Sequence, residues 1–111
     1  MSKSELLIPD TALGDPERVE MARIWVAKGG LHCNLRIGGW SVASKGAEVT
    51  PVLERRAWGI LLSDIARHVA DALSKKEQVP KEEILNTLVG TFLSEVRTDA
   101  GQPQGDFKES Q

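Results

Sequence analysis

The stretch that decides the fold is MARIWVAKGGLHCNLRIGG, residues 21–39. Its Gly29-Gly30 pair suits the positive φ of a tight turn, and apolar and polar residues alternate on both sides of the pair. A period of two places successive side chains on opposite faces of a strand. The stretch therefore predicts a β-hairpin with Gly29-Gly30 as its loop.

The two faces of this hairpin differ in chemistry. Opposed residues share a face, so with this loop Arg23 is expected directly opposite Arg36, an unfavourable pair of like charges. The apolar face carries Ala22, Ile24, Val26, Cys33, Leu35 and Ile37, and the polar face carries Arg23, Trp25, Ala27, His32, Asn34 and Arg36. A competing interpretation makes residues 16–26 a helix, but we expect only a helical turn at residues 16–20.

Two amphipathic helices are predicted after the hairpin. Thr50-Pro51 is a helix start signal, and apolar residues then recur at three- and four-residue steps through residues 52–75. Val79-Pro80 interrupts the chain and starts a second helix, in which Gly90 indicates a close contact with a neighbouring element.

These elements predict an α+β fold in which an antiparallel β-hairpin packs against two amphipathic helices, because a lone hairpin is unstable in water. Residues 47–49 could add a third short strand. Residues 5–8 are either an edge strand or an arm that packs on the core. We expect one compact domain over residues 1–98 and a disordered polar tail over residues 99–111.

Composition narrows the class of protein. The chain has 111 residues and a formal net charge of −2, and the acidic tail accounts for that charge, so the nearly neutral body disfavours nucleic-acid binding. The single cysteine, Cys33, excludes a disulfide within the chain and fits a reducing cytoplasm. We see no signal peptide and no apolar run long enough for a membrane span.

The first candidate site is the polar hairpin face, which combines arginine and tryptophan as binding hot spots do. It would bind an acidic partner, a second subunit or an anion. The alternative is that Glu20 or another acid of the chain pairs with the arginines and that the N-terminal arm covers Trp25. The residues proposed for binding are Arg23, Trp25, His32, Asn34 and Arg36.

A second candidate site lies on the first long helix, where Asp64, Arg67 and His68 fall close together. Asp64 and His68 are four residues apart, as in a carboxylate-oriented base or a pair of metal ligands. A metal site needs more ligands than these, and a solvated histidine beside an acid is the simpler interpretation. Cys33 and His32 point to opposite faces of a strand, so they form no nucleophile–base pair. We therefore expect no metal, no cofactor and no catalytic residue.

Two segments carry a resemblance to a known family. IWVAKGGLHCNLRIGGW (residues 24–40) and AWGILLSDIARHVADAL (residues 57–73), followed by an amphipathic helix, resemble small bacterial proteins grouped as domain of unknown function 5076. The resemblance implies a compact bacterial cytoplasmic domain and assigns no activity. We predict a non-enzymatic protein-interaction module, with a second copy of the chain as one candidate partner and with neither nucleic acid nor membrane as a partner. The alternative is a small-ligand or anion-binding protein, or an enzyme, using Asp64, Arg67 and His68.

Overall fold

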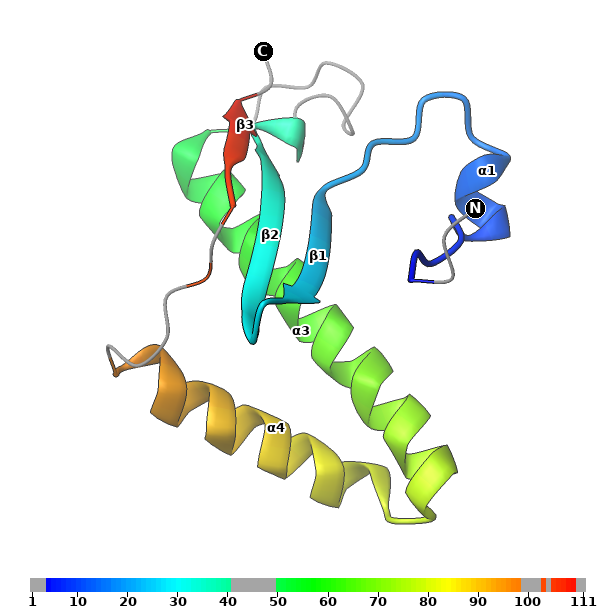
Figure 1. Cartoon of the computed structure of the whole chain (residues 1–111). Helices are drawn as coiled ribbons and strands as arrows, with labels where there is room; N and C mark the ends of the chain where they lie inside the picture. The colour runs from blue at the N-terminus through cyan, green and yellow to red at the C-terminus, as the bar shows by residue number, and fades with distance from the viewer. Residues whose placement is uncertain (1–3, 41–49, 99–102, 104, 110–111) are drawn as a thin grey trace.

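The computed structural model describes residues 4–40, 50–98, 103 and 105–109 (Figure 1). A short helix, α1 (Asp10–Leu13), precedes strands β1 (Ala22–Ala27) and β2 (Gly30–Ile37). Two long helices, α3 (Pro51–Glu77) and α4 (Lys81–Val96), follow, and strand β3 (Phe107–Glu109) comes last. The α+β class with an antiparallel hairpin and two long helices is therefore confirmed.

The hairpin loop lies one residue earlier than predicted. Ala27 pairs with Gly30, so Lys28 and Gly29 form the loop, with φ of 51° and 74°. Positive φ at both central residues is the requirement of the type I′ turn, whose twist matches that of the flanking strands. The predicted Gly29-Gly30 loop is wrong.

This shift changes the cross-strand partners but not the two faces. Each residue moves to a partner two positions away, and a shift of two keeps every side chain on its side of the sheet. Arg23 lies opposite Asn34 rather than Arg36. The expected pair of opposed arginines is therefore wrong, and the observed pairing avoids placing two like charges face to face.

The C-terminal residues add a strand that the sequence did not predict. β3 pairs with β2 in parallel, with Leu35 beside Phe107, and completes a sheet of order β1-β2-β3. The amide of Leu35 donates to the carbonyl of Asp106 over 3.0 Å. A disordered tail is thus wrong for residues 107–109, because the open edge of β2 offers backbone groups to pair with. The strand predicted at residues 47–49 lies outside the described residues.

Gly105 lets β3 approach β2 closely. Its φ is +132°, and a Cβ built there would lie 1.9 Å from the carbonyl oxygen of Cys33. The neighbouring Asp106 amide donates to Oδ1 of Asn34 over 2.9 Å. The start of β3 is therefore held by both the backbone and a side chain of β2.

The two long helices begin and end on recognisable signals. Thr50 caps α3 by accepting from the amide of Leu53 over 3.3 Å, and Pro51 occupies the first turn. Gln78, with φ of 57°, ends α3 in the left-handed conformation. Pro80 then leads into α4, as predicted. Figure 1 shows α4 turning back from the end of α3 and diverging from it.

A carboxylate joins the hairpin to the start of α3. Oε2 of Glu54 accepts from the amide of Gly38 over 3.2 Å and from Nε1 of Trp58 over 2.8 Å. The Trp58 ring meets Trp40 edge to face, with centroids 6.0 Å apart and planes at 80°. Trp40 Nε1 is buried and has no hydrogen-bond partner among the described residues. This joint fixes where the sheet sits relative to α3.

Packing elsewhere is sparse. Ala70 and Ile84 are the only buried hydrophobic residues in the part of the chain that the structure describes, with 0% and 8% exposure. Val26, on the apolar hairpin face, is 82% exposed, so the helices cover that face only in part. A Cβ on Gly90 would meet nothing within 4 Å. The close contact predicted at Gly90 is therefore wrong within one chain.

The N-terminal segment is neither an edge strand nor packed on a core. Pro9 precedes α1, and Gly14 ends it. Leu6 is 96% exposed, and Leu7 and Leu13 are also exposed. The helix expected at residues 16–20 is wrong: residues 16–17 form only a turn, and the short helix of this segment is α1, at Asp10–Leu13.

Candidate functional site

The polar face of the hairpin carries all five residues predicted for binding. Trp25 lies opposite His32, and Arg23 lies opposite Asn34. Nε2 of His32 lies 3.0 Å from the carbonyl oxygen of Ala27, near the hairpin loop. Trp25 is 36% exposed, so the N-terminal arm does not cover it fully. The indole ring is therefore available to a partner.

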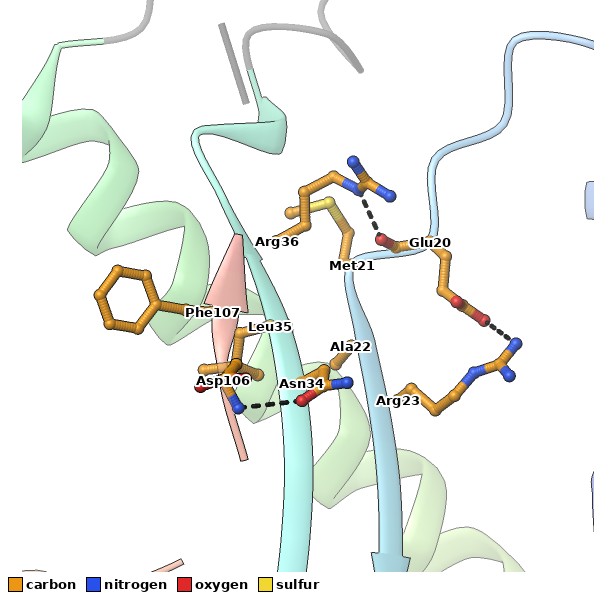
Figure 2. Close-up of a pocket in the computed structure, with 9 residues that line it drawn as sticks. All are labelled: Glu20, Met21, Ala22, Arg23, Asn34, Leu35, Arg36, Asp106 and Phe107. Carbon is orange, nitrogen blue, oxygen red and sulfur yellow. Dashed lines mark hydrogen bonds and ion pairs between the residues drawn. The ribbon is translucent and has the colours of Figure 1, made fainter. Parts of the chain in front are cut away.

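Glu20 bridges the two arginines just before β1. Its carboxylate pairs with Nη2 of Arg23 over 3.1 Å, and its backbone carbonyl accepts from Nε of Arg36 over 3.0 Å (Figure 2). The hydrogen bond that Arg23 donates to the Glu20 carboxylate, and then the negative charge of that carboxylate, raise the pKa of Arg23 above its ordinary value. This is the pairing with Glu20 that the sequence left open as an alternative.

The two arginines border a hollow of about 450 Å³ at the end of the sheet away from the hairpin loop (Figure 2). Both strands of the hairpin and β3 contribute to its lining. The residues that line it are Glu20, Met21, Ala22, Arg23, Asn34, Leu35, Arg36, Asp106 and Phe107. The structure thus gathers three of the predicted residues around the hollow and leaves Trp25 and His32 nearer the hairpin loop.

Sequence reasoning missed the wall that β3 supplies. Phe107 is exposed and is the only aromatic residue in residues 99–111. A lone aromatic in a polar tail was the available signal, since such tails otherwise lack the side chains that pack on a folded surface. Glu20 was visible as a neighbour of the arginines, but its bridging position depends on the register of the hairpin.

One family of proteins matches most of this chain. The family described as "Domain of unknown function (DUF5076)" matches residues 5–99, from the N-terminal arm to just beyond α4. This chain belongs to the DUF5076 family. The match confirms the resemblance seen in the hairpin and in α3, and it assigns no activity to any residue of this DUF5076 domain.

A solved structure has a similar fold. It is described as a "putative pyruvate dehydrogenase from the photosynthetic bacterium Rhodopseudomonas palustrus CGA009". It is 25% identical to this DUF5076 domain, with a TM-score of 0.63, and the alignment covers 91% of this chain and 90% of that one. No curated protein matches the DUF5076 domain.

The second candidate site of this DUF5076 domain is an open helix surface. Arg67 forms an ion pair with Asp64, and both side chains are more than half exposed. His68 is exposed on the same stretch of α3. Among the described residues, no three histidine, cysteine or acidic side chains come close enough together to hold a metal ion. The structure therefore places Asp64, Arg67 and His68 together without enclosing them.

One ion pair further along α3 is well formed. Nζ of Lys75 lies 3.2 Å from Oδ2 of Asp71. The hydrogen bond from Lys75, and then its charge, lower the pKa of Asp71, with smaller contributions from Lys81 and His68. In the described part of this DUF5076 domain, neither long helix is long and apolar enough to cross a membrane.

Proposed function

We propose that this protein is a non-enzymatic interaction module whose polar hairpin face binds another protein. The observation that carries the proposal is that Trp25, Arg23 and Arg36 share one face of the hairpin, with the two arginines beside an open hollow. Tryptophan and arginine are the residues most enriched among interface hot spots. Phe107 pairs with Leu35 and therefore lies on the opposite, apolar face of the sheet, so it does not belong to this surface.

The electrostatics of the hollow favour a protein surface over a small anion. The side chains of Arg23 and Glu20 are 53% and 54% exposed and already form an ion pair. A small anion would compete with Glu20 for Arg23 and would remain largely in water. Small-ligand pockets instead enclose most of the ligand within mainly apolar walls. A protein partner could replace this ion pair with charged groups of its own while covering Trp25.

The proposed setting is the bacterial cytoplasm. The single cysteine Cys33 supports a reducing compartment, and the family resemblance supports a bacterial source. Nucleic acid and membrane stay outside the proposal, because the body of the chain carries almost no net charge to attract polyanions.

The test compares two hairpin variants with a control variant on α3. Trp25→Ser and Arg36→Glu change the proposed surface, whereas Ile60→Ser changes an exposed apolar residue of α3. Proteins captured from a bacterial lysate are quantified by mass spectrometry, and the melting temperature of each variant is measured. Loss of a hot spot costs about 2 kcal/mol or more, so we expect at least a roughly 30-fold loss of the captured partner with Trp25→Ser.

The melting temperatures decide how that loss is interpreted. Trp25→Ser should change the melting temperature no more than Ile60→Ser does, because both side chains are partly exposed. If Trp25→Ser lowers the melting temperature as strongly as it lowers capture, Trp25 stabilises the fold and the proposal is wrong.

The description of the similar solved structure supports testing a second candidate function. A small-ligand or anion-binding protein, or an enzyme, would use Asp64, Arg67 and His68 on α3. A rise in melting temperature with pyruvate or inorganic phosphate that Arg67→Gln abolishes, and Arg36→Gln does not, would favour this function over the interaction module.

A further inference from the structure

An apolar surface runs over both long helices, and no element among the described residues covers it. On α4, Val89, Phe92, Leu93 and Val96 recur at three- and four-residue steps, as the buried side of an amphipathic helix does. Phe92 is 54% exposed and Val96 61%. We call this surface, together with two residues of α3, the helix stripe: Leu62, Ile65, Val89, Phe92, Leu93 and Val96.

The helix stripe exists because the two helices diverge. Near the turn between them, Ile84 is buried and Leu88 is half-buried, so the first half of α4 packs on the end of α3. Figure 1 shows the second half of α4 running away from α3. The same apolar side of α4 therefore starts in a contact and continues into solvent.

The chain as a whole exposes more surface than a folded monomer of its size. Its accessible area is 9372 Å², whereas the area expected for 12.1 kDa is about 6,000 Å². Its radius of gyration is 16.0 Å, against about 13 Å for a compact domain of this length. The excess, about 3,400 Å², is more than the roughly 1,000–2,500 Å² that each chain buries in an obligate homodimer interface, so it leaves room for one.

The energetics point in the same direction. Ordering the backbone costs about 1–2 kcal/mol for each residue, while burying one large apolar side chain contributes about 1.5–3 kcal/mol. Within the described residues, Ile84 is the one large side chain that is buried. Leu61, Leu73, Leu85 and Leu88 are only half-buried, so the two long helices gain little apolar burial to offset the entropy of ordering them, and a partner on their apolar surface would add it.

We propose that this partner is a second copy of the chain, and that the helix stripes of the two copies pack together to form the missing core. A chain that folds only with a partner requires that partner in equal amount. A second copy of the chain always meets this requirement. Closed two-fold dimers are the commonest soluble oligomers, and their interface uses the same patch twice. The helix stripe carries no charged residue, as the centre of such an interface requires.

Gly90 gains an explanation in this dimer. A glycine inside a helix costs about 1 kcal/mol relative to alanine, and within one chain nothing approaches its position. It adjoins Val89 and lies one turn before Leu93 and Ser94, so a partner helix packed on the helix stripe could approach the backbone there. This proposal goes beyond the proposed function, because it uses a surface other than the polar hairpin face.

The experiment measures the solution mass by light scattering and the melting temperature over a range of protein concentrations. Phe92→Ser tests the helix stripe, Phe92→Leu preserves its apolar character, and Asn86→Ser changes an exposed polar residue of α4. Arg36→Glu tests the polar hairpin face in parallel. Wild type, Phe92→Leu, Asn86→Ser and Arg36→Glu should all have twice the mass of one chain, and their melting temperatures should rise with concentration.

Phe92→Ser should lose the dimer and, with it, the cooperative unfolding transition followed by circular dichroism. A wild-type monomer that unfolds cooperatively at a concentration-independent temperature overturns the proposal. So does a wild-type chain that is unfolded alone and folds only with a different protein. A dimer that Arg36→Glu dissociates and Phe92→Ser does not would place the second copy on the hairpin face, which supports the proposed function and refutes this inference.

Discussion

Replacing Glu54 by alanine should separate the hairpin from α3. The carboxylate accepts one hydrogen bond from the backbone of β2's end and one from Trp58, at 3.2 and 2.8 Å. A hydrogen bond to a charged group contributes about 1.5–3 kcal/mol, and removing the acceptor leaves two partly buried donors without a partner. We therefore expect Glu54→Ala to lower the free energy of unfolding by about 2–4 kcal/mol. This is less than two bonds of full strength would give, because the bond from Gly38 is long and both donors are only partly buried.

This loss is large compared with the stability of a small domain. A change of 1 kcal/mol shifts the melting temperature of such a domain by about 4–8 °C, so the expected fall is roughly 8–32 °C. Thermal unfolding followed by tryptophan fluorescence measures it directly, because Trp58 itself is a partner. All variants are compared at one protein concentration.

Three controls isolate the role of Glu54. Glu54→Gln keeps an acceptor without the charge and should cost about half as much, since charge-assisted hydrogen bonds are roughly twice as strong as neutral ones. Glu82→Ala removes an exposed acid from the first turn of α4, where only about 0.3–1 kcal/mol of helix-dipole stabilisation is lost. Trp58→Phe combined with Glu54→Ala should be less destabilising than the sum of the two single changes. If Glu54→Ala costs no more than Glu82→Ala, the joint does not hold the sheet to α3 and the reasoning is refuted.

Three further predictions concern the sheet and α3. Lys28→Asn should raise the free energy of unfolding by about 0.5–1 kcal/mol in chemical denaturation, because Lys28 has φ of 51° and asparagine suits the type I′ position better; a loss of stability would contradict the observed loop. Gly105→Ala should release β3 and speed hydrogen exchange at the amide of Leu35, which donates to Asp106, and unchanged exchange would show that β3 does not depend on that close approach. Lys75→Met should raise the pKa of Asp71 towards its ordinary value of 3.8, as measured by NMR titration. Because the folded-state pKa of Asp71 is lowered, its pair with Lys75 stabilises the fold above the unfolded-state pKa and is lost as the pH falls through the folded-state pKa; an Asp71 titration that Lys75→Met leaves unchanged would contradict the pair.

The faces of the hairpin could be predicted from the sequence, but the pairing across it could not. Alternation alone assigns residues to faces, and any shift by two keeps that assignment. Both Lys28-Gly29 and Gly29-Gly30 are chemically acceptable loops, so local sequence leaves the register open. The two registers differ in their charges: the predicted one opposes Arg23 to Arg36, and the observed one opposes Arg23 to Asn34.

The helices were predicted well because their signals are local. Thr50-Pro51 and Val79-Pro80 mark the starts of α3 and α4, and both helices follow. β3 was missed because a three-residue strand has no periodicity to detect and pairs with a segment far away in the sequence. The contact predicted at Gly90 was wrong within the chain, where nothing lies within 4 Å of a Cβ built there, because a helical glycine does not by itself identify a neighbour.

The parallel pairing of β3 has a kinetic consequence. β1 and β2 meet across a two-residue loop, whereas the hydrogen bond between Asp106 and Asn34 joins residues 72 apart. Local hairpins close within microseconds, and pairings distant in sequence form late because the intervening chain must be ordered first. β3 should therefore be the last strand to dock and the first to detach. The wall of the hollow that contains Asp106 and Phe107 would then open and close while the rest of the sheet stays folded, so the polar hairpin face would alternate between a wider and a narrower form on a timescale faster than global unfolding.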